Sequence, residues 1–237
     1  MKFICSQNLF GFAVFEDFEP IDYTFLGIHG NGIAQKDGYI YIADYKDVLK
    51  VKYPNEVVEK IHHDGWDNIH TVFFDSDSLL VASTANNTAY RDGEVILGFP
   101  GNHYHNSLIP YGQDYYLMGL RTPKTMLIYN KKEGKVEKEI HLPFLNNMHS
   151  PTHYKDDLFL VSDGDGVVLF NEEGKPIQKS PHMNWPRGIK VVDELAYVVD
   201  RSSLYEYDVA NNEISRRVEN PVHRSSFGAF FDLVVIN

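Results

Sequence analysis

The stretch Tyr39-Ile40-Tyr41-Ile42-Ala43-Asp44 is a short apolar run that ends in an aspartate, and the same pattern returns twice along the chain. It recurs as Leu158-Phe159-Leu160-Val161-Ser162-Asp163 and as Leu195-Ala196-Tyr197-Val198-Val199-Asp200. In each copy a second apolar run follows a few residues later, at 48–53, 167–170 and 204–207. Weaker copies lie at 79–83 and 115–120. The chain is therefore built from repeats of about forty residues, each holding several short strands.

Six such repeats fill the chain. A small or polar residue precedes the incoming strand of each repeat: Asn31, His70, Ser107, Ser150, Arg187 and Ser225. The step from Ser225 through the C-terminus and back to Asn31 matches the other steps, so the repeats close on themselves. Repeats of this period that contain several strands are typical of a β-propeller. We predict an all-β fold, a single six-bladed β-propeller domain spanning residues 1–237.

The two ends of the chain are unusually apolar. Segments 2–15 and 227–236 would be exposed, aggregation-prone edges if they stayed unpaired. We therefore predict that the N- and C-terminal strands share one blade and close the ring. The sequence leaves the division open: 227–236 forms one strand or two, and the N-terminal segments 2–6, 9–15 and 21–26 form two or three.

Composition and charge exclude several classes of protein. The 237 residues carry a net charge of −11, which argues against binding nucleic acid or an anionic membrane surface, because both need a cationic face. Cys5 is the only cysteine, so no internal disulfide is possible. Neither a signal peptide nor an apolar run of the roughly 18 residues needed for a membrane helix is evident. We expect a cytoplasmic protein that does not enter a membrane.

The quoted runs resemble the blades of known six-bladed propellers. Segments 39–53, 158–171 and 195–208 are similar to blades of the NHL-repeat and gluconolactonase (SMP-30-like) kind, and the likeness covers most of the chain as a pattern. The resemblance implies that Asp44, Asp163 and Asp200 organise the turns that follow their strands. Calcium-dependent gluconolactonases also share acidic and amide ligands at the axis, including a Glu, and this sequence has no axial Glu.

Histidine is concentrated in the loops that lead into the innermost strands. These incoming loops comprise segments 27–31, 61–70, 101–107, 146–150, 180–187 and 220–226. Nine of the eleven histidines lie in them: His29, His62, His63, His70, His103, His105, His149, His182 and His223. Because all these loops open on one face of a propeller, the pattern predicts a pocket rich in imidazole at the axis. The alternative is that the histidines cap strands and bond to the turn backbone.

Two chemical uses suit converging imidazoles. Neutral histidine is a common ligand of transition metals, and His70, His105 and His149 are the predicted ligands, with His29 as a fourth. The expected cofactor is one divalent ion, zinc, iron or manganese, with calcium less favoured. Alternatively, a single histidine acts as a general base. His149, His105 and Arg187 are the predicted catalytic residues.

Other residues on this face are predicted to bind the ligand. They are Asn31, Trp66, Asn106, Trp185 and Arg224. Arg91, Arg121 and Arg201 are predicted to follow second strands, where they either reach an anionic group or form a solvated rim. The leading hypothesis is a hydrolase or lyase that acts on a small polar substrate, sugar-like or anionic. The alternative is a non-catalytic propeller that senses a small-molecule ligand or binds a protein partner through the same face.

Overall fold

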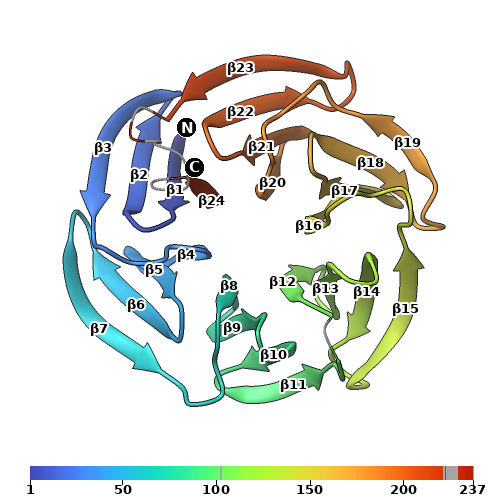
Figure 1. Ribbon diagram of the computed structural model, residues 1–237, viewed down its shortest axis with the longest axis horizontal. Helices are drawn as coiled ribbons and strands as arrows, with labels where there is room; N and C mark the ends of the chain where they lie inside the picture. Colours follow the sequence, from blue (N-terminus) through green and yellow to red (C-terminus); the bar gives the residue numbers. More distant parts are fainter. Residues whose placement is uncertain (102, 221, 223–228, 237) are drawn as a thin grey trace.

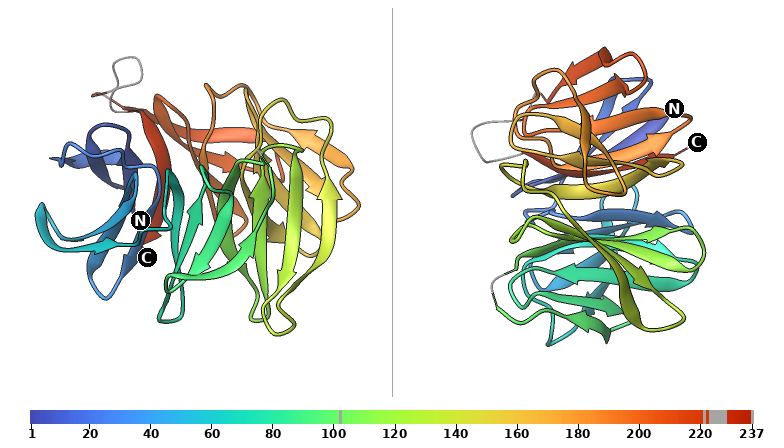
Figure 2. Two further views of the ribbon diagram at one scale, coloured as in Figure 1. Left: turned by 60° about the horizontal axis from the view of Figure 1, so that its bottom comes forward. Right: turned by 90° about the vertical axis from the view of Figure 1, so that its right-hand side faces the viewer.

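The computed structural model describes residues 1–101, 103–220, 222 and 229–236. Six four-stranded antiparallel sheets form a closed ring, which confirms the predicted six-bladed β-propeller (Figure 1). In each blade the strands lie side by side from the axis to the outer wall (Figures 1 and 2). In the part of the chain described here, no helix is long and apolar enough to cross a membrane.

One blade is built from both ends of the chain, as predicted. It combines β24 (Phe230–Ile236), β1 (Lys2–Gln7), β2 (Gly11–Glu16) and β3 (Glu19–Phe25), in that order from the axis outward. The C-terminus therefore gives one strand and the N-terminus three. Lys2 pairs with Ile236, so the two ends of the chain lie next to each other.

The other five blades each follow the chain from the innermost strand to the outermost. The second holds β4 (Ile33–Lys36), β5 (Tyr39–Asp44), β6 (Asp47–Lys52) and β7 (Glu56–His62). The third holds β8 (Ile69–Asp75), β9 (Ser78–Ser83), β10 (Thr88–Arg91) and β11 (Glu94–Gly98). The fourth holds β12 (His105–Tyr111), β13 (Tyr115–Leu120), β14 (Thr125–Asn130) and β15 (Lys135–His141). The fifth holds β16 (His149–Lys155), β17 (Leu158–Ser162), β18 (Val167–Asn171) and β19 (Pro176–Lys179). The sixth holds β20 (Gly188–Val192), β21 (Leu195–Val199), β22 (Ser203–Asp208) and β23 (Glu213–Glu219).

The apolar runs become second strands because both faces of each blade are covered. Along β5, Ile40 and Ile42 pack against the closing blade, whereas Tyr41 and Ala43 pack against the third blade. Successive side chains of a strand point to opposite faces, so a strand buried on both faces must be apolar at every position. Six such clusters join the six pairs of neighbouring blades.

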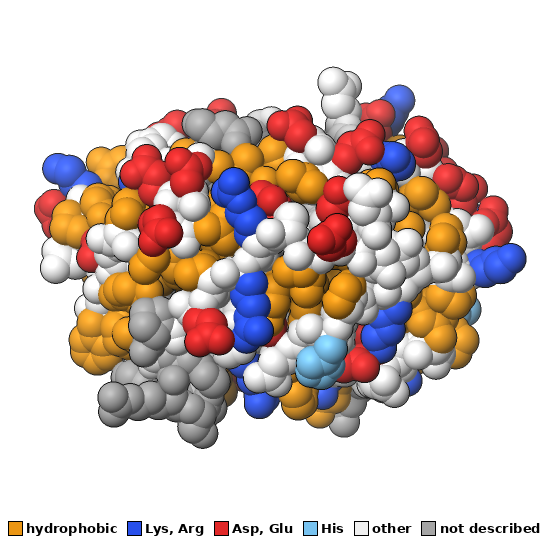
Figure 3. Space-filling view, turned by 90° about the horizontal axis from the view of Figure 1, so that it is seen from above, with side chains coloured by type: hydrophobic (Ala, Val, Ile, Leu, Met, Phe, Trp, Pro, Cys, Tyr) orange, Lys and Arg blue, Asp and Glu red, His pale blue; other side chains and the backbone are white. Residues whose placement is uncertain are grey.

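The outermost strands are polar and face solvent. β7 is exposed along almost its whole length, and β23 carries two glutamates and two arginines. Charged side chains on an edge strand oppose pairing with other molecules. On the flank shown in Figure 3, acidic side chains are interspersed with lysine and arginine.

The aspartates at the ends of second strands hold the incoming loop of their own blade. Oδ1 of Asp163 accepts hydrogen bonds from the backbone N–H groups of Asn146 and Asn147, at 2.7 and 2.8 Å. Oδ2 of Asp200 accepts one from the backbone N–H of Asn184 at 2.7 Å, and Oδ1 of Asp44 accepts one from that of His29 at 3.2 Å. These carboxylates set the positions of the loops that surround the axis.

Candidate functional site

A pocket of about 330 Å³ opens at the axis, where the innermost strands begin. We call it the axial pocket. It is lined by Asn8, His29, Asn31, Asn68, His70, Thr84, Tyr104, Asn106, Arg121, His149, Arg187 and Phe231. Six of the predicted site residues are therefore brought together there: His29, Asn31, His70, Asn106, His149 and Arg187. No aspartate or glutamate is among the lining residues described.

Four of the six innermost strands carry a β-bulge at the end that faces this pocket. The register shifts between Ile69 and Thr71 in β8, between His105 and Ser107 in β12, and after His149 in β16. A fourth shift lies opposite Ser6, where β24 holds an extra residue. A bulge places an extra residue on one strand and re-aims its side chain. His70, Asn106 and Phe231 fall within these bulges and line the axial pocket.

His149 and Arg187 form a direct contact in this pocket. Nη1 of Arg187 lies 2.8 Å from Nε2 and 3.3 Å from Nδ1 of His149. Nδ2 of Asn106 lies 3.1 Å from Nδ1 of His149 and also donates to the Met148 carbonyl at 2.8 Å, which determines the orientation of the amide. Burial, and then the charge of Arg187, hold the pKa of His149 well below its usual value. The ring is therefore neutral at pH 7.

A neutral imidazole has one N–H and one lone pair, so it accepts at only one nitrogen. Both nitrogens of His149 face donors, from Arg187 on one side and Asn106 on the other. If Nδ1 carries the lone pair, Asn106 and Arg187 share that one acceptor, at 3.1 and 3.3 Å; if Nε2 carries it, Asn106 has no acceptor on this ring. The site contains more donors than acceptors, and a ligand that brings acceptor oxygens would correct the imbalance.

Arg187 carries a charge that no carboxylate neutralises. Among the described residues it forms no ion pair, and its buried Nε has no hydrogen-bond partner. Its guanidinium group instead lies 5.3 Å from the ring of Trp185 and 5.0 Å from that of Phe231. Burial, followed by the charges of Arg201 and Arg121, lowers the pKa of Arg187 to about 10, so the group remains a cation at neutral pH.

His70 presents a lone pair to the pocket. Its Nδ1 lies 2.8 Å from Oγ1 of Thr84 and 3.2 Å from the carbonyl of Asn68. Thr84 uses its own proton on the His105 carbonyl at 2.7 Å, so Nδ1 of His70 must be the donor and Nε2 the acceptor. Burial is the main reason that the pKa of His70 falls to about 4, and the charges of Arg187 and Arg121 lower it further. His70 is thus a second neutral imidazole at the axis.

Three other predicted residues lie outside the axial pocket. His105 is fully buried, with its ring 5.5 Å from that of Phe99. Trp66 is only 2% exposed and packs in the core between the second and third blades. Trp185 is half-buried between two guanidinium groups, with that of Arg201 at 4.3 Å, so it supports Arg187 instead of lining the pocket. Arg224 lies outside the described residues.

The predicted ring of four histidine ligands is not assembled. Within the described ranges, no group of three or more His, Cys, Asp or Glu side chains is arranged so that it could hold a metal ion. His105 is fully buried outside the axial pocket, and His29 is exposed. The amides of the pocket have no carboxylate beside them, so its residues do not fit the acidic calcium site of gluconolactonases either.

Some lining residues escaped the sequence analysis. Asn8 and Thr84 follow the second strands of their blades, as Arg121 does, and this position was a usable signal because such loops open on the same face. Asn68 and Tyr104 lie in incoming loops and have positive φ angles of 53° and 50°. No sequence pattern indicates which side chain of an irregular loop points inward.

Comparison with known proteins identifies the fold but no family. No known family matches the sequence, and no curated protein resembles it significantly. A solved protein of unknown function from Bacteroides caccae is similar, with a TM-score of 0.75 at 15% identity over 98% of this chain and 97% of its own. A chain of a nidogen/laminin complex has a TM-score of 0.77 at 10% identity, again over 98% and 97%.

A lyase is also among the similar structures. Virginiamycin B lyase from Staphylococcus aureus has a TM-score of 0.61 at 14% identity, over 81% of this chain and 70% of its own. A catalytically inactive variant of that lyase, in which one histidine is replaced by alanine, was solved with quinupristin and has a TM-score of 0.62. At such low identity these likenesses establish the propeller fold alone.

Proposed function

We propose that this propeller is an enzyme, a hydrolase or lyase, that binds a small anionic substrate in the axial pocket. The observation that carries the proposal is the uncompensated guanidinium group of Arg187 beside the neutral ring of His149. Arg121 adds a second positive charge, and no described lining residue is acidic. An anion is therefore the ligand that this pocket favours electrostatically.

The partial burial of Arg187 strengthens this argument. A charge that is partly withdrawn from water without a partner destabilises a protein, so such groups are normally paired. Here a carboxylate or phosphate of the ligand would supply the missing partner and occupy the free Nε donor. The volume of about 330 Å³ lies at the lower end of the range of about 300 to 1,000 Å³ for ligand sites, so the substrate is small.

His70 and His149 are the candidate general bases. In a lyase reaction, one imidazole would take the proton from the carbon next to the substrate's carboxylate or carbonyl group. The electron pair left on that carbon would then form a C=C bond as the group on the adjacent carbon departs with its bonding electrons. Arg187 would stabilise the negative charge that develops on the oxygen. In a hydrolase the same base would activate a water molecule. A lyase with a similar fold, which loses activity when one histidine is replaced, supports the choice of a histidine base.

Substrate binding would activate these bases. The charge of Arg187 contributes to the low pKa values of both His70 and His149. An anion bound to Arg187 would offset that charge and raise both pKa values toward the range in which imidazole is an effective base. The bound substrate is thus expected to improve proton transfer at its own site.

The test combines binding and turnover. We would screen small hydroxy acids, lactones and inorganic phosphate by calorimetry and by product analysis, and compare the wild type with Arg187→Met. We expect loss of at least tenfold in affinity for the anions that bind. Arg216→Met, which removes a charge from the outer strand β23, is the matched control and should bind as the wild type does. Equal affinity in the Arg187 variant would rule the proposal out.

The second candidate is a non-catalytic ligand sensor that uses the same pocket. The observation in its favour is the pKa of His70, about 4, which makes a weak base. The two candidates differ in the effect of His70→Asn and His149→Asn on a bound ligand. An enzyme loses turnover and keeps binding, whereas a sensor shows no turnover before or after the substitutions.

A further inference from the structure

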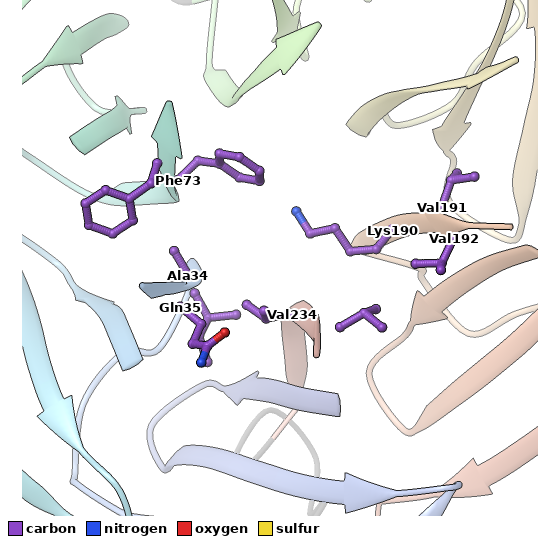
Figure 4. Close-up of a pocket in the computed structure, with 10 residues that line it drawn as sticks. Ala34, Gln35, Phe73, Lys190, Val191, Val192 and Val234 are labelled. Carbon is purple, nitrogen blue, oxygen red and sulfur yellow. The ribbon is translucent and has the colours of Figure 1, made fainter. Parts of the chain in front are cut away.

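A second pocket lies at the opposite end of the axis and is chemically unlike the first. The axial pocket surrounds the beginnings of the innermost strands, whereas this one, the distal pocket, surrounds the later residues of β8, β20 and β24 together with Ile33, Ala34 and Gln35 of β4. Its volume is about 230 Å³. Figure 4 shows that its lining side chains come from these four strands, with Lys190 extending across the space between them.

The walls of the distal pocket are mainly apolar. They include Phe73 and Phe74 from β8, Val191 and Val192 from β20, and Val234 and Val235 from β24. Each of these residues also packs against a core cluster between neighbouring blades, so it presents only part of its surface to the pocket. A hollow with such walls favours the apolar part of a ligand.

One positively charged side chain, Lys190, lines the distal pocket beside these apolar residues. Lys190 extends from β20 toward Phe73, and its ammonium nitrogen lies 4.8 Å from the centre of that ring (Figure 4). Among the described residues, Lys190 forms no ion pair within 4.0 Å. Lys36 provides a contrast: it lies 5.1 Å from the ring of Phe74, but it is neutralised by Asp77.

The nearest buried carboxylate does not satisfy Lys190. Asp232 accepts hydrogen bonds from the backbone N–H groups of Leu233, at 2.9 Å, and of Ile33, at 3.4 Å. Burial raises the pKa of Asp232, and the charge of Lys190 opposes that rise, so the two groups interact only at a distance. The ammonium group therefore keeps its capacity to bind an anionic oxygen.

The two pockets are separate sites. Between them the axis narrows to cavities of about 20 Å³ each, lined by residues that include Thr71, Ser150 and Asp232. A cavity of this size holds about one water molecule. A ligand in the distal pocket therefore cannot reach Arg187, and a ligand in the axial pocket cannot reach Lys190.

We propose that the distal pocket binds a small apolar monocarboxylate, such as a short fatty acid. The carboxylate would contact Nζ of Lys190, and the hydrocarbon part would pack against Phe73 and the valines. Water leaving the apolar walls would favour the hydrocarbon part, and the cation would select an acid over an uncharged molecule of the same size. This site is independent of the proposed function of the axial pocket.

The experiment compares hexanoate with hexan-1-ol by calorimetric titration at pH 7. The wild type should bind hexanoate more tightly than the alcohol. Lys190→Met keeps the length of the side chain but removes its charge, so it should weaken hexanoate binding at least tenfold and remove the preference over the alcohol. Lys190→Arg retains a cation and should preserve that preference.

Two further variants locate the site. Lys36→Met removes a lysine that lies beside Phe74 and is already paired with Asp77. Arg187→Met removes the cation of the axial pocket. Both should bind hexanoate with the affinity of the wild type at the distal pocket, and the methyl NMR signals of Val234 and Val235 should shift. Unchanged affinity in Lys190→Met, or loss of hexanoate binding in Arg187→Met alone, would overturn the inference.

Discussion

His149 is buried and His70 is half-buried, and both line the open axial pocket. Each is neutral because burial and the nearby arginines disfavour a second positive charge. Thr84 determines the tautomer of His70, whereas His149 offers a single lone pair to two donors, Asn106 and Arg187. The donors that lack an acceptor therefore lie at His149 and on Arg187 beside it.

This arrangement predicts the pH dependence of turnover. Because the pKa values of His70 and His149 lie below 6.5 in the free protein, kcat/KM should stay constant as the pH falls through 6.5 and decline only nearer 4. With an anionic substrate bound to Arg187, the pKa of the base rises, so kcat should decline at a higher pH than kcat/KM. Steady-state kinetics between pH 4 and 8 measures the acidic decline of kcat/KM and that of kcat. If kcat and kcat/KM declined at the same pH, the proposed effect of the Arg187 charge on the pKa of the base would be contradicted.

The buried His105 predicts how stability depends on pH. Its pKa falls to about 4, mainly through burial, whereas in the unfolded chain it is about 6.5. Between these values the unfolded state binds more protons, so stability is complete above pH 6.5 and declines as the pH falls through this window. The contribution of His105 is on the order of 3 kcal/mol.

Urea unfolding of the wild type and of His105→Leu, at pH 7.5 and at pH 4.5, tests this expectation. The substitution replaces the imidazole with an apolar side chain of similar size and so removes the titrating group. The variant should lose less unfolding free energy than the wild type between the two pH values. An equal loss in both proteins would show that protonation of His105 does not destabilise the fold.

Among the elements, the loops around the axis depend on the aspartates that end the second strands. Asp200 is fully buried and accepts hydrogen bonds from the backbone N–H groups of Asn184, Ser202 and Ser203, each at 2.7 Å, and from the hydroxyl of Tyr205 at 2.6 Å. Hydrogen bonds to a charged group contribute about 1.5 to 3 kcal/mol each. The incoming loop before β20, which carries Arg187, is anchored by this one carboxylate.

We therefore expect Asp200→Ala to lower the free energy of unfolding by at least about 3 kcal/mol. Asp44→Ala is the matched control, since that aspartate occupies the same place in its blade but accepts one hydrogen bond, from the backbone N–H of His29. Because this bond is long, at 3.2 Å, and exposed to solvent, its loss should cost about 1 kcal/mol or less. Chemical denaturation measures both variants. If the two variants lost similar amounts of unfolding free energy, the number of hydrogen bonds to the aspartate would not determine how strongly it holds its incoming loop.

For the molecule as a whole, closure of the ring depends on a single C-terminal strand. β24 pairs with β1 in its own blade and contributes the fully buried Phe230 and Leu233 to the core shared with the sixth blade. Since Lys2 pairs with Ile236, a short linker can join the natural ends. The closure should therefore not depend on where the chain begins.

A circular permutant tests this expectation. Opening the chain in the exposed turn between Glu133 and Gly134, and joining the natural ends, should preserve the circular dichroism spectrum and a single cooperative unfolding transition. A truncated chain that lacks residues 229–237 should lose that cooperativity, because the apolar faces of three neighbouring blades would be exposed. A fully cooperative truncated protein would show that β24 is dispensable for closure.

The sequence by itself determined the architecture. Strands such as Tyr39–Asp44 are apolar at consecutive positions because they are buried on both faces, and this pattern is visible in the chain without any knowledge of contacts. The same holds for the apolar ends, which must pair, and for the position of the candidate pocket. Half a dozen of the residues predicted there do line it, from His29 to Arg187.

Only the tertiary structure decided which of those side chains meet, and it separated His105, Trp66 and Trp185 from the pocket. The β-bulges that aim His70 and Asn106 at the axis are register shifts between strands, and they leave no trace in the sequence of either strand. The distal pocket has the same origin, because Phe73, Lys190 and Val234 approach one another only when three blades converge. Periodicity along the chain encodes burial, whereas the geometry of a site depends on distances between residues that the chain holds far apart.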